Sequence, residues 1–355
     1  MASCFDLLWW SRCVHREGYI LRGSNDYSSL SRALSCGLLA LGVSWPAVAS
    51  EPLYAKNLSP VTGLFGLPSQ RDARATPRGA FAGALHASVA SHYVNDGKGD
   101  EFLNLDGETQ RFALEIRYGL ADSWDVQLEV PWVDQSGGDL DRLIDDWHDL
   151  WGMSDGGRSD VPRDQLDYRY LSPQGGFSLQ DSASGIGDVS LSANWAFHSD
   201  EKAAASLVLG YKFGTGDDDE FTGSGADDAF VALRFSGDHL SQLPLAWHAQ
   251  VGYLRAGESD VVEDLQHRDL WFAGLTMDWR VATRWSVLVQ LDANRAPLDS
   301  EITGVGDDAV MLTVGTRWQF TPHWSAEISV IEDIRVETAP DVTFQAGLRY
   351  RPSRD

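Results

Sequence analysis

The segment Gln110–Trp132 constrains the fold of this chain most, because it reads as two alternating strands joined by a short turn. Side chains of a strand point alternately to opposite faces. One face of this predicted hairpin is wholly apolar and carries Phe112, Leu114, Ile116, Tyr118, Trp124, Val126, Leu128, Val130 and Trp132. The other face is polar and carries Arg111, Glu115, Arg117, Asp125, Gln127 and Glu129. An apolar face with aromatic residues at its ends is typical of a strand that faces lipid.

The same pattern recurs from residue 79 to residue 350. It predicts about twelve strands of roughly 9–13 residues, a length that crosses a bilayer at a tilt. Short turns near residues 120, 200, 240, 283 and 322 alternate with longer, acidic connections. This alternation is typical of bacterial outer-membrane barrels, in which the short turns are periplasmic. We therefore predict an all-β fold, a transmembrane antiparallel up-and-down β-barrel over residues 79–350, rather than a soluble β-sandwich.

The first 49 residues predict export. Ala33–Val43 is an apolar run preceded by arginines and followed by Ala47-Val48-Ala49, which is an A-x-A cleavage pattern. The run is too short to span a membrane. We therefore expect a signal peptide over residues 1–49, cleaved near Ala49, and passage through the periplasm to the cell outer membrane. All three cysteines lie within this leader, so no disulfide is expected in the mature chain.

Two parts of the predicted mature chain do not alternate. Residues 50–78 contain four prolines and are predicted to be either a periplasmic extension or a segment inserted into the barrel lumen. Residues 133–186 are predicted to be a long external loop, in which the helical spacing of the apolar residues indicates a short helix over Leu140–Trp151. The remainder of this loop is expected to be irregular, and residues 351–355 are expected to form a C-terminal tail.

Three stretches of the sequence resemble a known family. They are Asn57-Leu58-Ser59-Pro60, Gly66-Leu67-Pro68 and the hairpin sequence YGLADSWDVQLEVPW of residues 118–132. The chain resembles the DUF3187 family of uncharacterised proteins of Gram-negative bacteria, over essentially the whole mature sequence. The resemblance implies an outer-membrane barrel protein. It implies no catalytic residues, because the family carries no established activity.

The charge of the chain limits its partners. The formal net charge is −24, so nucleic acid, itself a polyanion, is not expected to bind. The expected partners are outer-membrane lipid and lipopolysaccharide, the barrel-assembly machinery during biogenesis, and a small-molecule solute. No cofactor and no metal site are expected. The Asp-rich loops at residues 217–220, 227–228 and 307–308 lack EF-hand spacing and are interpreted as solvated loops, with divalent ions bridging them to lipopolysaccharide phosphates as the alternative.

The polar strand faces supply the candidate functional residues, because these faces turn inward in a closed barrel. The lumen-lining candidates are Arg111, Glu115, Arg117, Gln127, Glu129, Gln290, Asp292, His86 and His92. The first interpretation is a narrow pore or uptake channel for small solutes that selects by charge. One alternative is a structural or surface-interaction barrel with a sealed lumen. Another is a lipid-modifying enzyme, which is disfavoured because the outward faces carry no Ser/His pair and no G-x-S-x-G motif is present.

Overall fold

The computed structural model describes residues 50–138, 164–238, 243–335 and 337–353. The chain divides into two units, Met1–Ala47 and Val48–Asp355, and the described residues belong to the second unit. The predicted signal peptide over residues 1–49 and the predicted helix Leu140–Trp151 therefore lie outside the described residues.

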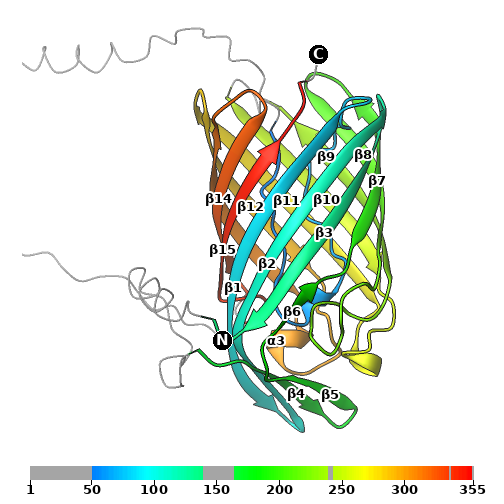
Figure 1. Ribbon diagram of the computed structural model, residues 1–355, viewed down its shortest axis with the longest axis vertical. Coiled ribbons are helices and arrows are strands. Elements are labelled where there is room, and N and C mark those ends of the chain that lie inside the picture. Colours follow the sequence, from blue (N-terminus) through cyan, green and yellow to red (C-terminus); the bar gives the residue numbers. More distant parts are fainter. Residues whose placement is uncertain (1–49, 139–163, 239–242, 336, 354–355) are drawn as a thin grey trace, which may run out of the picture. The chain divides into compact units, whose positions relative to one another are not determined.

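Twelve antiparallel strands form a closed barrel (Figure 1). Consecutive barrel strands pair with one another, and the last strand pairs with the first to close the ring. The prediction of a twelve-stranded up-and-down barrel is therefore confirmed. The barrel strands are β1 (Phe81–Lys98), β2 (Glu101–Ala121), β3 (Trp124–Ser136), β7 (Ser190–Ser199), β8 (Ala203–Lys212), β9 (Asp228–Gly237), β10 (Leu245–Arg255), β11 (Asp269–Ala282), β12 (Trp285–Asn294), β13 (Ala309–Gln319), β14 (Trp324–Asp333) and β15 (Val342–Tyr350).

Three further strands lie between β3 and β7 in the sequence: β4 (Asp167–Ser172), β5 (Gly175–Leu179) and β6 (Ala183–Ile186). The expectation that this part of the long loop is irregular is wrong. β2 extends beyond its pairing with β3, so its residues Phe102–Asp106 present a free edge, and β4 pairs with that edge. β5 then pairs with β4, and β6 pairs with the end of β3.

The helices that the structure describes are short. They are η1 (Thr62–Leu64), η3 (Glu263–Leu265) and α3 (Thr303–Gly306). None of them has the length and hydropathy needed to cross a bilayer.

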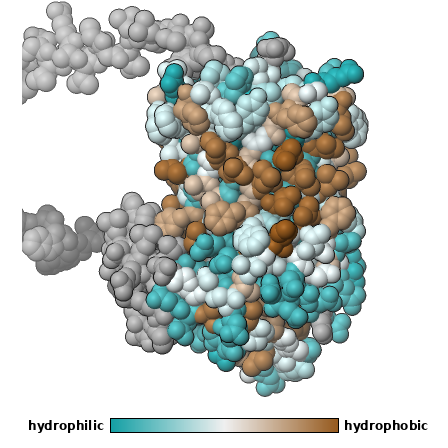
Figure 2. Space-filling view, in the orientation of Figure 1, coloured by the Kyte–Doolittle hydropathy of each residue, from teal (hydrophilic) through white to brown (hydrophobic). Residues whose placement is uncertain are grey.

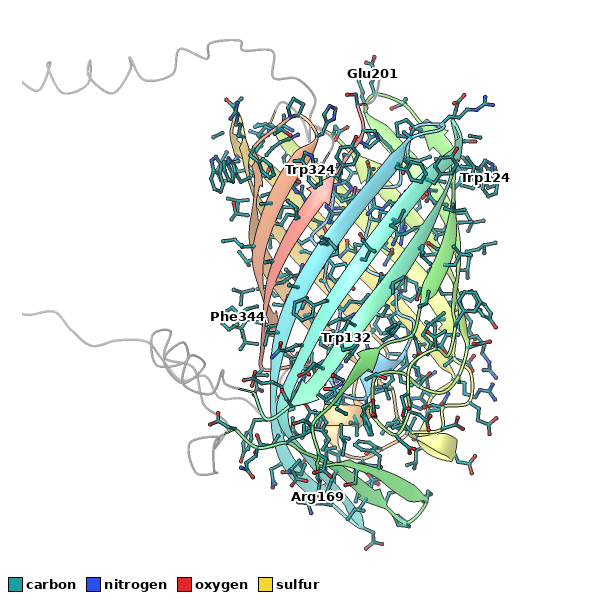
Figure 3. The ribbon with its side chains drawn as sticks, in the orientation of Figure 1. Trp124, Trp132, Arg169, Glu201, Trp324 and Phe344 are labelled. Carbon is teal, nitrogen blue, oxygen red and sulfur yellow. The ribbon has the colours of Figure 1, made fainter. Side chains whose placement is uncertain are left out.

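The outer surface of the barrel carries an apolar belt (Figure 2). Leu114, Leu209 and Ile328 on this belt are 40%, 59% and 62% exposed. Trp124 and Trp324 lie at the end of the barrel that carries the short turns, hereafter the short-turn end (Figure 3). A contiguous belt of exposed apolar side chains is unfavourable in water but suits hydrocarbon, with tryptophans at the boundary. The belt is therefore the surface that a membrane-spanning barrel presents.

At the other end of the barrel, the long connections enclose a hydrophobic cluster, hereafter the cap. The cap joins the far end of β2, the β4–β5 hairpin and the loops around η3 and α3 (Figure 1). Burial of these side chains away from water stabilises the connections as a folded layer over the mouth. Its members include Leu103, Leu105, Tyr168, Tyr170, Phe177, Leu254, Leu270, Leu298 and Ile302, together with Val61, Leu64 and Phe65 from the N-terminal side of the barrel.

The belt can be tested with a single added charge. Leu114→Arg puts a guanidinium in the middle of the belt, and Ser199→Arg adds the same charge at an exposed position of the short-turn end. We expect Leu114→Arg to lower the free energy of unfolding by ~2–4 kcal/mol, as arginine does at a bilayer midplane. Ser199→Arg should leave it nearly unchanged. Urea titration of the two variants in lipid vesicles measures the difference, and equal effects would show that the belt does not contact lipid.

Candidate functional site

Residues 50–78, hereafter the lumen segment, lie between opposite walls of the barrel. The backbone N–H of Leu53 donates to Gln290 Oε1 on β12 at 3.0 Å. The hydroxyl of the next residue, Tyr54, donates to Glu129 Oε1 on β3, also at 3.0 Å. Five strands separate β3 from β12 in either direction around the ring. Neighbouring residues of the segment therefore contact facing walls, which places the segment inside the lumen.

The lumen segment passes through the barrel twice. Ser50 lies at the short-turn end, where its hydroxyl donates to Asp278 at 2.7 Å. The chain then reaches the cap, where Thr62 and Leu64 of the turn Thr62–Leu64 are buried. On its return, Arg74 Nη2 lies 2.8 Å from Asp238 Oδ2 just after β9. The segment thus begins and ends at the short-turn end, and its tip is part of the cap.

Side-chain contacts, rather than strand pairing, hold the lumen segment. Within the described part of the chain, its backbone bridges to a wall strand only between Arg78 and Gly119. Its four prolines lack an N–H donor and so disfavour its addition to a sheet. Backbone N–H groups of the segment instead donate to wall side chains, in the pairs Leu53–Gln290, Gly66–Asp228, Ala73–Ser236 and Thr76–Asp125.

The candidates from the opening hairpin form two neighbouring hydrogen-bonded groups on the inner side of β2 and β3. Arg111 Nη2 donates to Glu129 Oε1 at 2.6 Å. Arg117 Nε donates to Gln127 Oε1 at 3.0 Å, and Gln127 Nε2 donates to Glu115 Oε1 at 3.0 Å. Each residue thus has a partner of complementary charge or polarity across the strand pair. The structure brings all five candidates together.

The two candidate histidines lie at different levels of the same strand. His86 Nε2 lies 3.3 Å from Glu115 Oε2, and its ring stacks on Tyr54 of the lumen segment with centroids 4.1 Å apart. His92 lies nearer the cap, where its Nε2 is 2.9 Å from Thr109 Oγ1. His86 therefore contacts the group of Glu115, and His92 contacts Thr109, which donates to Gln135 on β3.

Gln290 and Asp292 face the lumen segment from β12. Gln290 Nε2 donates to Asp292 Oδ2, and Gln70 Nε2 of the segment donates to Asp292 Oδ1, both at 2.8 Å. Gly274 of β11 permits this approach, because a Cβ atom there would lie 2.3 Å from Gln70 Nε2. Asp292 thus contacts the returning pass of the segment, whereas Gln290 contacts the outgoing pass at Leu53.

Three arginines that the sequence analysis missed join Arg117 around Glu51 of the lumen segment. Arg117 Nη1 lies 2.9 Å from Glu51 Oε1, and Arg349 Nη1 lies 3.8 Å from the same atom. Arg351 pairs with Glu51 Oε2, and Arg317 donates to the backbone carbonyl of Glu51. Glu51 is only 2% exposed. We call this arrangement the Glu51 site.

Wall carboxylates balance most of the charge of the Glu51 site. Glu327 Oε1 accepts from Arg317 Nε at 2.7 Å and from Arg349 Nε at 3.2 Å. Asp278 Oδ2 accepts from Arg317 Nη1 at 3.0 Å, and Glu115 Oε2 lies 3.9 Å from Arg349 Nη1. Four guanidinium groups therefore meet three wall carboxylates, and the lumen segment supplies the fourth. Removing one partner of such a buried pair costs roughly 3–5 kcal/mol.

His248 is another buried residue that the sequence analysis did not select. Its Nε2 lies 2.9 Å from Ser50 Oγ, and its Nδ1 lies 2.8 Å from Ser236 Oγ. Asp278 accepts from the Ser50 hydroxyl and not from the imidazole. A Ser-His-Asp triad requires the carboxylate on the imidazole, so this arrangement ties the start of the lumen segment to the wall and is not a triad.

At the cap end, Lys212 fixes the turn of the lumen segment. Its Nζ donates to the carbonyl of Leu64 at 3.0 Å and to Asp188 Oδ2 at 2.7 Å. Asp228 Oδ2 lies 3.3 Å from the same Nζ and accepts from the N–H of Gly66 at 2.8 Å. Asp228 is 2% exposed. Its interpretation as part of a solvated loop is therefore wrong, because it is the first inward residue of β9 and pairs with a buried lysine.

Little open volume is left in the lumen. A cavity of about 80 Å³ lies between the lumen segment and the wall, and Lys56, Gln250 and Asn294 are among its lining residues. Pockets that hold small-molecule ligands measure ~300–1,000 Å³. Among the residues that the structure describes, no group of three or more His, Cys, Asp or Glu side chains is placed to hold a metal ion. The lumen is therefore filled by protein in this state.

Comparison with solved structures supports the fold. The COG4313 outer membrane channel from Pseudomonas putida F1 superposes with a TM-score of 0.51 at 16% identity, over 79% of this chain and 97% of that chain. The KdgM porin gives 0.41 at 9% identity, over 76% and 99% of the two chains. The NanC porin gives 0.43 at 9% identity, over 77% and 100%. The likeness to the first of these shows a shared barrel fold.

Among curated proteins, none matches this sequence. The model of the family described as "Protein of unknown function (DUF3187)" matches residues 28–352. This match includes the lumen segment, the barrel strands and the motifs on which the resemblance rested. The chain therefore belongs to the DUF3187 family.

Proposed function

We propose that this protein is an outer-membrane channel for the uptake of small solutes, and that the lumen segment closes it in the state described. One observation carries the proposal. A charged, polar lumen is filled by a segment that side chains hold and that stays outside the sheet. The apolar belt and the short turns support a position in the outer membrane with the short-turn end in the periplasm. A protein in that position would contact outer-membrane lipid and lipopolysaccharide, and the barrel-assembly machinery would insert it.

The chemistry of the wall favours a lumen that opens. Glu115, Arg117 and Gln290 are among the polar wall residues buried against the lumen segment. If the segment leaves, water can hydrogen-bond to these groups and restore much of the lost interaction. Withdrawal also breaks no ladder of the barrel, because among the described residues the segment pairs with no wall strand beyond the bridge at Arg78. The barrel can thus stay folded while water replaces the lumen segment.

A sealed structural barrel is the second candidate, and the cap favours it. Val61, Leu64 and Phe65 of the lumen segment are buried in the hydrophobic cluster there, so withdrawal exposes apolar surface to water. A lipid-modifying enzyme has no such support. His86 and His92 are 3% and 2% exposed and bond to Glu115 and Thr109, facing away from lipid.

Removing the lumen segment separates the two candidates. We expect the full chain to show low conductance with brief openings in planar bilayers. A variant that lacks residues 51–78 should conduct steadily, because the polar wall then lines a water-filled path. Heat-modifiable mobility in gel electrophoresis serves as the control that the variant barrel is folded. A folded variant that passes no current would contradict the channel.

A cross-link tests whether the segment itself is the closing element. The N–H of Ala73 donates to Ser236 Oγ at 2.9 Å. Ala73→Cys with Ser236→Cys therefore introduces a thiol at each of two contacting residues, in a mature chain predicted to contain no other cysteine. The disulfide should abolish the openings, and a reductant should restore them. Each single-cysteine variant is a matched control. Openings that persist in fully cross-linked protein would show that solutes pass without movement of the segment.

A further inference from the structure

We infer that the Glu51 site is a carboxylate-binding site for the transported solute, and that Glu51 occupies it as an internal substitute while the channel is closed. This inference rests on the proposed channel function and names its solute class, small molecules that carry a carboxylate.

The arrangement around the Glu51 side chain is that of an anion receptor. Arg117, Arg349 and Arg351 approach one carboxylate from three different wall positions. Guanidinium groups present paired N–H donors in a planar fork, which matches the two oxygens of a carboxylate. All three arginines come from β2, β15 or the residue directly after β15, so they belong to the barrel and stay in place when the lumen segment moves.

The carboxylate of Glu51 fits this receptor imperfectly. Its Oε1 atom is buried and has no hydrogen-bond partner, although Arg117 Nη1 lies only 2.9 Å away. The charge is therefore compensated while the hydrogen-bonding capacity of that oxygen is not. A free carboxylate is not tethered to a backbone and can turn to accept paired donors from a guanidinium. A solute can thus compete with the tethered group.

Withdrawal of the lumen segment removes the carboxylate of Glu51 from the Glu51 site, and no other anion replaces it. Without Glu51, the guanidinium groups of Arg117, Arg317, Arg349 and Arg351 outnumber the three wall carboxylates with which they form ion pairs, Glu115, Asp278 and Glu327. Arg317 and Arg351 also lose the backbone carbonyl groups of Glu51 and Ser50, to which they donate. An uncompensated guanidinium inside a narrow barrel attracts anions. The open state therefore presents a vacant site for one carboxylate at the short-turn end of the path.

Acetate is the probe for the binding step, because it resembles the part of the side chain that Glu51→Ala removes. We expect acetate to raise the Tm of the full-length Glu51→Ala protein in detergent by about 2–4 °C over an equal concentration of chloride. The wild type should show a smaller shift, since acetate has to displace the carboxylate of Glu51 from the site. Asp72→Ala is the matched control, because it removes another buried carboxylate of the lumen segment, one paired with Arg74 outside the Glu51 site.

An equal shift in Asp72→Ala, or no shift in Glu51→Ala, would overturn the inference. A second arm uses the unmodified full chain in planar bilayers. Acetate should increase the frequency of openings over chloride, and methylammonium should not. If acetate stabilises Glu51→Ala while neither protein ever opens, the carboxylate site stands and the channel fails. If the channel opens without any acetate effect in either arm, the carboxylate site fails and the channel stands.

Discussion

The pairing of β1 with β15 is the interaction on which the rest of this structure depends. A strand in hydrocarbon has no water to satisfy its backbone N–H and C=O groups, so a membrane-spanning sheet has to close on itself. Closure then separates the two faces of every strand. Outward residues form the apolar belt. Inward residues are polar, because polar and apolar residues alternate along each strand, and they line a narrow lumen. The polar groups of that lumen need partners, either water or protein.

The lumen segment is the partner that the chain provides. Its prolines keep it out of the sheet, and its backbone donors are satisfied by wall side chains such as Gln290 and Asp228. Its charged residues meet wall charges of opposite sign, as Glu51 meets Arg117. The tip is held differently, by apolar contacts in the cap and by Lys212 at the carbonyl of Leu64. Polar contacts thus hold the two ends of the segment, and hydrophobic burial together with Lys212 holds its tip. Both sets of contacts have to break before the lumen can open.

Local periodicity predicted the barrel well, because the alternation of apolar and polar residues within each strand shows which face contacts lipid. The same periodicity led to the inward polar residues Arg111, Glu115 and Glu129. The same alternation holds for Arg317 and Arg349, which lie next to the outward residues Trp318 and Leu348 in the sequence. The inward position of these two arginines could therefore have been predicted. Their shared partner Glu51 was not, because contacts between an irregular segment and distant strands leave no periodic trace. The strands β4 to β6 escaped prediction for a related reason, since β4 exists through the free edge of β2.

We propose that the lumen is a water path that residues 50–78 occupy. Thr313 reports on it directly, because it lies inward on β13, is fully buried, and its Oγ1 atom has no hydrogen-bond partner. The measurement is the rate at which Thr313→Cys in reconstituted vesicles reacts with a membrane-impermeant thiol reagent. We expect slow reaction in the full chain and many times faster reaction once residues 51–78 are removed. Equally slow reaction in both folded proteins would contradict it, because the lumen would then be closed by its own wall.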